Sequence, residues 1–312
     1  MKERNITLDY FKILLSILVV IIHLPIVDMP TSTSKVFGEG FLYSIGIFIS
    51  FGLTKIAVPS FFIINGYFLD FTDQKKVIKY ITKMIKIYVV WTLFYLPFMI
   101  EKASIGMYPL LLAMGFYHLW YLPALIGAAI GIFFIKKYLN NNILLLIIAI
   151  LLLGIGYYIQ QTNPHSSLRI FMYRNFLFMG IPFVLLGNLI KSFNFSQYKR
   201  LIPILLIISL CTLFFESSVY ISKYGVMPNI YISLIILCPV LMIFVLQNSK
   251  KKAIMNDDIG QLSSAIFFIH PAILFLIHIP APNIFILPFV IISSVFLSFA
   301  IIQANKSLKI FL

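Results

Sequence analysis

Charged side chains are scarce in this chain of 312 residues, and acidic ones are the scarcest. Asp and Glu together number 10 against 24 Lys and Arg, and charged residues make up only 11% of a chain that is 61% hydrophobic. A soluble domain carries roughly 25% charged residues, so this chain lacks the polar surface that water requires. With a mean hydropathy of +1.01, it is predicted to be an integral membrane protein.

Cysteine and the common catalytic signatures are also missing. The only two cysteines, Cys211 and Cys238, lie in apolar runs, which excludes a disulfide framework and a cysteine metal site. No Gly-rich phosphate loop, HExxH, GxSxG or run of acidic metal ligands occurs, so we expect neither a metal nor a bound cofactor. The first apolar run contains Asp9 and Lys12 and no cleavage site follows it, which favours a retained helix over a signal peptide.

Long apolar runs recur along the whole chain. A membrane-spanning helix needs roughly 20 apolar residues, and this length predicts about ten spans. They are expected at 8–27, 52–70, 82–100, 118–137, 143–160, 174–191, 201–219, 228–247, 262–279 and 284–304. The fold class is therefore all-α, a polytopic membrane helix bundle forming one domain over 1–312, with no appended soluble domain. The segment 31–51 is also apolar, but counting it as a span would make the number of spans odd. It is therefore interpreted as a surface or re-entrant helix.

The distribution of basic residues predicts the orientation of the bundle. If the spans alternate from a cytoplasmic N-terminus, one side holds seventeen Lys and Arg residues and the other holds six. The smaller set is Lys35, Lys55, Lys102, Arg169, Arg174 and Lys223. Cytoplasmic loops are enriched in Lys and Arg, so both termini are predicted to be cytoplasmic. The net charge of +14 is thereby explained by topology and contact with membrane lipid, and no nucleic-acid partner is expected.

Ionisable residues inside a span usually mark function, and the first helix has the most informative set. Because each residue turns a helix by about 100° and advances it by about 1.5 Å, Lys12 and His23 share one face roughly 16 Å apart. Asp9 and Ser16 lie close to the same line. This stripe should face the bundle interior or a wet cavity. The structural alternative is an Asp–Lys pair at the interface together with a hydrogen-bonded histidine.

Further polar residues stand at the ends of other spans. The stretch HLWYL at 118–122 is either an aromatic belt or part of a site, and the basic segment 75–86 either fixes topology or meets a phosphate. Arg174 and Glu216 are each interfacial or functional, and His270 is core or site. His165 and His278 are interpreted as surface and interface residues without a role.

Five stretches in order resemble the membrane-bound acyltransferase-3 family of multispan acyl-CoA-dependent acyltransferases. LDYFK at 8–12 with His23 is similar to the family's motif of a basic residue and a histidine with ten residues between them. The others lie at 58–69, 118–122, 180–187 and 262–271. Two positions depart from the pattern: Lys12 stands where Arg is commoner, which removes a planar two-pronged donor, and Asn65 replaces a serine.

The resemblance implies transfer of an acyl group, commonly acetyl, from cytoplasmic acyl-CoA as co-substrate to a hydroxyl of an envelope glycan or lipid-linked sugar. It implies that His23 acts as general base or acyl carrier, with Asp9 and His118 in the catalytic group. The acyl-CoA phosphates are expected at Lys12, Lys83 and Lys86. Acceptor-binding or orienting roles are expected for Trp120, Tyr121, Arg174 and Asn65.

Two other classes share the composition. A transporter or flippase of an envelope glycan or lipid-linked precursor also needs many spans and a polar stripe, but it consumes no acyl-CoA and does not require the ordered motifs. A glycan polymerase would need a large extracytoplasmic loop, whereas no loop expected here exceeds about 25 residues. Acyl transfer in a bacterial cytoplasmic membrane is therefore the favoured hypothesis.

Overall fold

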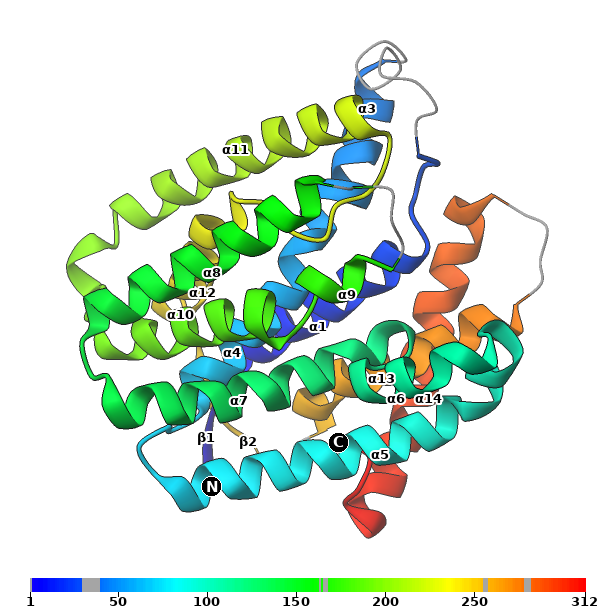
Figure 1. Ribbon diagram of the computed structural model, residues 1–312, viewed down its shortest axis with the longest axis horizontal. Helices are drawn as coiled ribbons and strands as arrows, with labels where there is room; N and C mark the ends of the chain where they lie inside the picture. Colours follow the sequence, from blue (N-terminus) through cyan, green and yellow to red (C-terminus); the bar gives the residue numbers. More distant parts are fainter. Residues whose placement is uncertain (1, 30–39, 163, 165–167, 255–257, 278–281) are drawn as a thin grey trace.

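The computed structural model describes residues 2–29, 40–162, 164, 168–254, 258–277 and 282–312. Most of them lie in helices, which confirms the all-helical class (Figure 1). Within the described residues, eight helical segments are long and apolar enough to cross a membrane. They are Ile6–His23 (α1), Phe41–Phe68, Gln74–Lys102 (α5), Tyr117–Tyr138, Asn142–Thr162 (α8), Leu201–Tyr224 (α11), Asp258–Leu276 (α13) and Asn283–Leu308 (α14). The chain is thus a multi-pass membrane protein.

Shorter elements complete the bundle or subdivide these segments. In chain order they are the strand Lys2–Asn5 (β1), Phe41–Ile47 (α3), a π-helix Phe48–Gly52, a 3-10 helix Leu53–Ile56, Ala57–Phe68 (α4), Ile105–Met107, Tyr108–Met114 (α6), Tyr117–Trp120, Tyr121–Tyr138 (α7), Ile170–Tyr173 (α9), a π-helix Phe176–Gly180, Ile181–Ser192 (α10), Ser196–Tyr198, Leu234–Gln247 (α12) and the strand Lys251–Ile254 (β2).

Two of the ten expected spans are shorter than the sequence suggests. The span expected at 174–191 is the helical segment Phe176–Ser192, and that at 228–247 begins only at Leu234. The residues before Leu234 are not helical. Their backbone is held by Glu216, whose carboxylate accepts hydrogen bonds from the N–H groups of Ile232 and Ser233 at 2.7 and 2.9 Å.

The interpretation of 31–51 as a separate surface or re-entrant helix is wrong for its described part. From Phe41 the chain is helical and continues through the π and 3-10 turns into α4, forming one segment of 28 residues, Phe41–Phe68. Ile47 and Phe51 are buried, so apolar packing keeps this segment within the bundle. Because it joins an existing span, the parity of the count is unchanged. Residues 31–39, like His165 and His278, lie outside the described residues.

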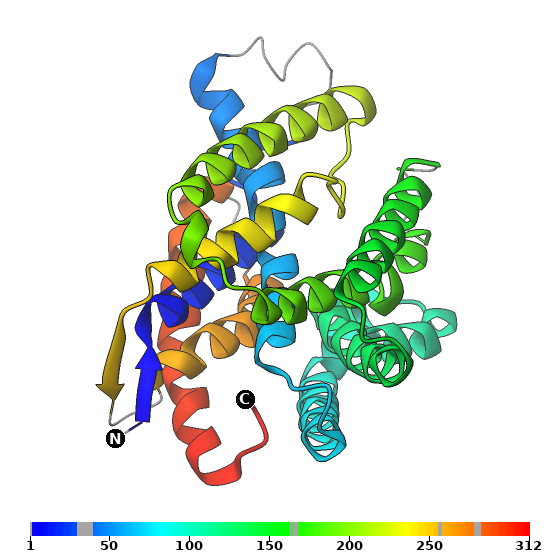
Figure 2. The same cartoon turned by 90° about the vertical axis from the view of Figure 1, so that its left-hand side faces the viewer.

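A two-stranded sheet, which the sequence analysis did not predict, joins the N-terminus to the segment before α13. Strand β1 pairs antiparallel with β2, and Asn5 caps α1 by accepting from the N–H of Leu8 at 3.0 Å. At the other end of the chain, the indole N–H of Trp91 in α5 donates to the carbonyl of Phe311 at 3.0 Å. Both ends of the chain lie in the lower part of the molecule in both views (Figures 1 and 2).

Helices α4 and α10 cross in backbone contact at two glycines. A Cβ on Gly66 would lie 2.0 Å from the carbonyl oxygen of Val184, and one on Gly187 would lie 2.0 Å from that of Ile63. Small residues permit such close approach between membrane helices. The glycines of the 58–69 and 180–187 motifs therefore set the crossing at which the two stretches meet.

Candidate active site

Three histidines from distant parts of the chain meet at one place. The ring of His23, at the end of α1, stacks on that of His270 in α13 with 5.4 Å between centroids. His118, in the short helix before α7, lies 5.6 Å from His270 by the same measure. Tyr117 also stacks on His23, with 4.4 Å between centroids. His270, which the sequence left open as core or site, therefore belongs to the site.

His270 is positioned by an opening in its helix at Pro271. The hydroxyl of Tyr95 donates to the carbonyl of Phe268 at 2.6 Å and accepts from the N–H of Ala272 at 3.1 Å. It thus stands between two backbone groups that bond directly to each other in an unbroken helix. The Nδ1 of His270 lies 3.1 Å from the carbonyl oxygen of Ile266 and donates to it. Its Nε2 then carries a lone pair and has no hydrogen-bond partner among the described residues.

A tight turn brings His118 to the same place. Gly115 has a positive φ of 92°, and a Cβ there would lie 2.4 Å from the backbone nitrogen of Trp120. Only glycine fits both conditions. Tyr117 also has a positive φ, 53°, and residues 117–120 form one 3-10 turn. His118 is buried there, with its ring edge against Tyr95 at 4.9 Å.

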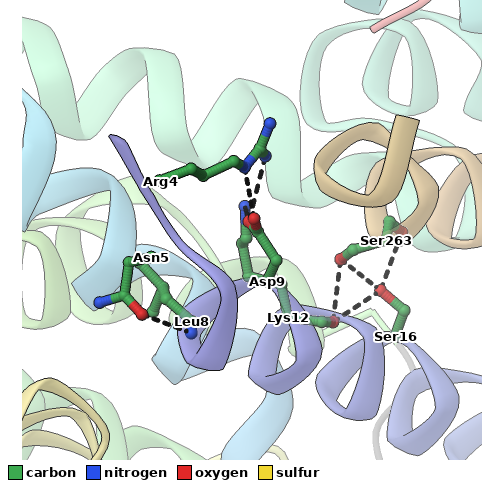
Figure 3. Close-up of polar contacts among 7 residues, drawn as sticks. All are labelled: Arg4, Asn5, Leu8, Asp9, Lys12, Ser16 and Ser263. Carbon is green, nitrogen blue, oxygen red and sulfur yellow. Dashed lines mark hydrogen bonds and ion pairs between the residues drawn. The ribbon is translucent and has the colours of Figure 1, made fainter. Parts of the chain in front are cut away.

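The polar stripe of α1 faces the bundle interior, as expected. Ser16 is fully buried and its hydroxyl lies 2.7 Å from that of Ser263 in α13 (Figure 3). Asp9 is buried and forms ion pairs with Arg4 and, at 2.7 Å, with the Nζ of Lys12. The structure does not bring Asp9 to the histidines, because fourteen residues of helix separate it from His23 by about 21 Å. Its contacts orient Lys12.

Lys12 lines a cavity of about 330 Å³, hereafter the Lys12 cavity, between α1, α4, α5, α7 and α13. Lys83 lines it too, and so do Asn65 and Tyr80. A second hollow of about 390 Å³ shares Lys83 with it. Its other polar lining residues are Gln261, Ser264, Asn305 and Lys309.

Lys86 is exposed and is not among the side chains that line either hollow. The Lys12 cavity therefore has cationic and apolar walls that suit a phosphate-bearing molecule with a long arm.

His23 lines a smaller cavity of about 50 Å³, hereafter the His23 chamber. The lining also contains His118, Trp120 and Arg174, whose guanidinium lies 4.9 Å above the Trp120 ring. Lys55 completes the charged lining. The sequence analysis had counted Lys55 only as a loop charge, although its position inside the expected span 52–70 was a signal of function.

Tyr121 and Phe267 line both the Lys12 cavity and the His23 chamber, and their rings lie 5.7 Å apart between centroids. Asn65 fixes the tyrosine by donating to its hydroxyl at 2.9 Å, and Asn65 in turn accepts from the hydroxyl of Tyr80 at 2.7 Å. These contacts favour an orienting role for Asn65. The two aromatic rings form the partition between the cavities.

Glu216 is interpreted as a helix cap. Replacing it by Ala removes the acceptor for two backbone N–H groups at the start of α12, so we expect the free energy of unfolding to fall by about 1–3 kcal/mol. Glu216→Gln, which keeps an acceptor oxygen, should lose less. Unfolding by denaturing detergent in mixed micelles measures this, with the exposed Glu101→Ala as the control. An unchanged Glu216→Ala protein would contradict the cap.

A family model described as an acyltransferase domain matches residues 5–303. The chain belongs to the acyltransferase 3 family. The relatives it resembles include a serine/alanine racemase of Enterococcus gallinarum, 26% identical over 86% of this chain and 40% of the relative. An amino-acid racemase of Enterococcus faecalis is 24% identical over 89% of this chain and 42% of the relative. The chain thus spans about two fifths of the length of these proteins. No solved structure matches it.

Proposed function

We propose that this acyltransferase moves an acetyl group from cytoplasmic acetyl-CoA to a hydroxyl of an envelope glycan or related acceptor. The observation that carries the proposal is the pair of cavities that meet at Tyr121 and Phe267. One has lysines for the phosphates of a donor, and the other has the histidines. A donor in the Lys12 cavity would bring its thioester to the partition.

The chemistry requires one base beside the acceptor. The acceptor hydroxyl attacks the thioester carbonyl carbon, the C–S bond breaks and an ester C–O bond forms. His23 takes the hydroxyl proton, because imidazole is the side chain suited to base work near neutral pH, and the proton then passes to the CoA thiolate. Tyr117 and His270 both stack on the His23 ring. His118, Trp120 and Arg174 line the acceptor side.

Lys83 supplies the test of the donor site. Replacing it by Met removes a charge-assisted contact worth about 1.5–3 kcal/mol, so we expect the KM for acetyl-CoA to rise about tenfold or more with kcat nearly unchanged. Labelled acetyl incorporated into envelope glycan by membranes containing each protein is the readout. Lys79→Met, an exposed lysine one helical turn away, is the matched control. Equal KM values for Lys83→Met and Lys79→Met would contradict this donor site.

A further inference from the structure

Lys55 is a cation buried in the middle of the Phe41–Phe68 segment. Only 6% of its surface is exposed, and among the described residues no carboxylate forms an ion pair with it. The carboxylates of Asp9 and Glu216 have other partners: Asp9 pairs with Arg4 and Lys12, and Glu216 caps α12. An ammonium buried in an apolar bundle is costly unless a counter-charge or polar group meets it.

Arg174 brings a second cation to the same chamber. Its charged group stacks on Trp120, which holds the guanidinium plane while leaving its edge donors for a ligand. Two like charges lining a chamber of about 50 Å³ repel each other. An anion bound between them attracts both and offsets that repulsion. An ammonium beside a planar guanidinium is a donor set that suits the oxygens of a carboxylate or phosphate.

We infer that Lys55 and Arg174 bind an oxyanion carried by the acceptor, so that the acceptor is an acidic molecule and not a neutral glycan. This inference rests on the proposed acyl transfer. Both cations share the chamber with His23, so the anionic group lies close to the hydroxyl that loses its proton there. The chamber has room for a small group only, and the rest of the acceptor extends outside it. The phosphates of the donor belong at Lys12 and Lys83, in the other cavity.

Chemically edited acceptors test the inference and distinguish its two sources. An envelope glycan fraction is used untreated, after carbodiimide-mediated reduction of its carboxyl groups, or after removal of its phosphates, and labelled acetyl incorporation is measured with each. We expect one of the two treatments to lower incorporation at least tenfold; which one does so identifies the anion. Equal labelling of all three fractions would overturn the inference while leaving acyl transfer intact.

Variants separate binding of the acceptor from stabilisation of the reaction. Lys55→Met and Arg174→Gln should each raise the KM for the acceptor about tenfold with little change in kcat or in the KM for acetyl-CoA. Arg174→Lys should recover part of the loss, and the exposed Lys223→Met should match wild type. A fall in kcat at unchanged acceptor KM would overturn the acceptor site, because the cations would then act on the developing oxyanion of the thioester.

If no acceptor fraction is labelled, the proposed acyl transfer is contradicted. A binding measurement still tests the anion site in that case. Purified protein in micelles is heated in acetate or methyl phosphate, with chloride at the same ionic strength as reference. We expect one of these anions to raise the unfolding midpoint of wild type and of Lys223→Met, but not of Lys55→Met. An equal response of all three proteins would overturn the anion site.

Discussion

Replacing His23 by Ala is expected to lower acyl transfer by about a thousandfold or more at equal protein levels. A positioned general base contributes roughly 10²–10⁴-fold to a rate, and this ring lines the His23 chamber and stacks with both Tyr117 and His270. The loss should appear in kcat, because the lysines proposed to bind the donor line the other cavity. Initial rates of labelled acetyl incorporation measure it.

Leu14→Ala is the matched control for this variant. It shortens a side chain on the same helix, but Leu14 is 52% exposed on the side of α1 away from the cavities, so normal activity is expected. A His23→Ala protein with a rate within twofold of that control would remove His23 from the mechanism. The site would then have to be rebuilt around His270, whose Nε2 is also free to accept a proton.

The second large effect concerns folding. Gly66→Ala places a methyl group 2.0 Å from a backbone carbonyl oxygen of α10, and no side-chain rotation relieves a clash with backbone. Overpacking usually costs about 1–3 kcal/mol, and separating two helices should bring this variant to the upper end of that range or beyond. We expect a large loss of folded protein, measured as the monodisperse fraction after detergent extraction.

Gly154→Ala is the control for the crossing, because a Cβ at that position of α8 meets nothing within 4 Å. Alanine also favours the helix over glycine, so this variant should be at least as stable as wild type. If Gly66→Ala and Gly154→Ala yielded equal amounts of folded protein, the close contact of α4 and α10 would be wrong.

The sequence was sufficient for the helical class and for part of the site. Periodicity placed Asp9, Lys12, Ser16 and His23 on one inward face, since a helix repeats by geometry alone. It offered the Asp9–Lys12 pair only as one of two alternatives, and it did not predict the second ion pair of Asp9 with Arg4, which β1 brings close.

Long-range contacts account for what sequence reasoning missed. His270 joins His23 only because α13 packs along α1, with the Ser16–Ser263 contact between them. Lys55 was visible as a charge within an apolar run. That it lines the same chamber as Arg174 depends on how the 3-10 helix Leu53–Ile56 and the end of α9 are placed. The small sheet was hidden because its strands lie about 250 residues apart and each is only four residues long.

The central claim is that acyl transfer consumes the thioester at His23. The most direct measurement follows free CoA thiol and acyl ester together, in proteoliposomes supplied with acetyl-CoA and an envelope acceptor fraction. The account predicts one thiol released per ester formed with wild type, and neither product above background with His23→Ala. Movement of the acceptor across the bilayer without thiol release, equal in both proteins, would contradict it and indicate a transporter.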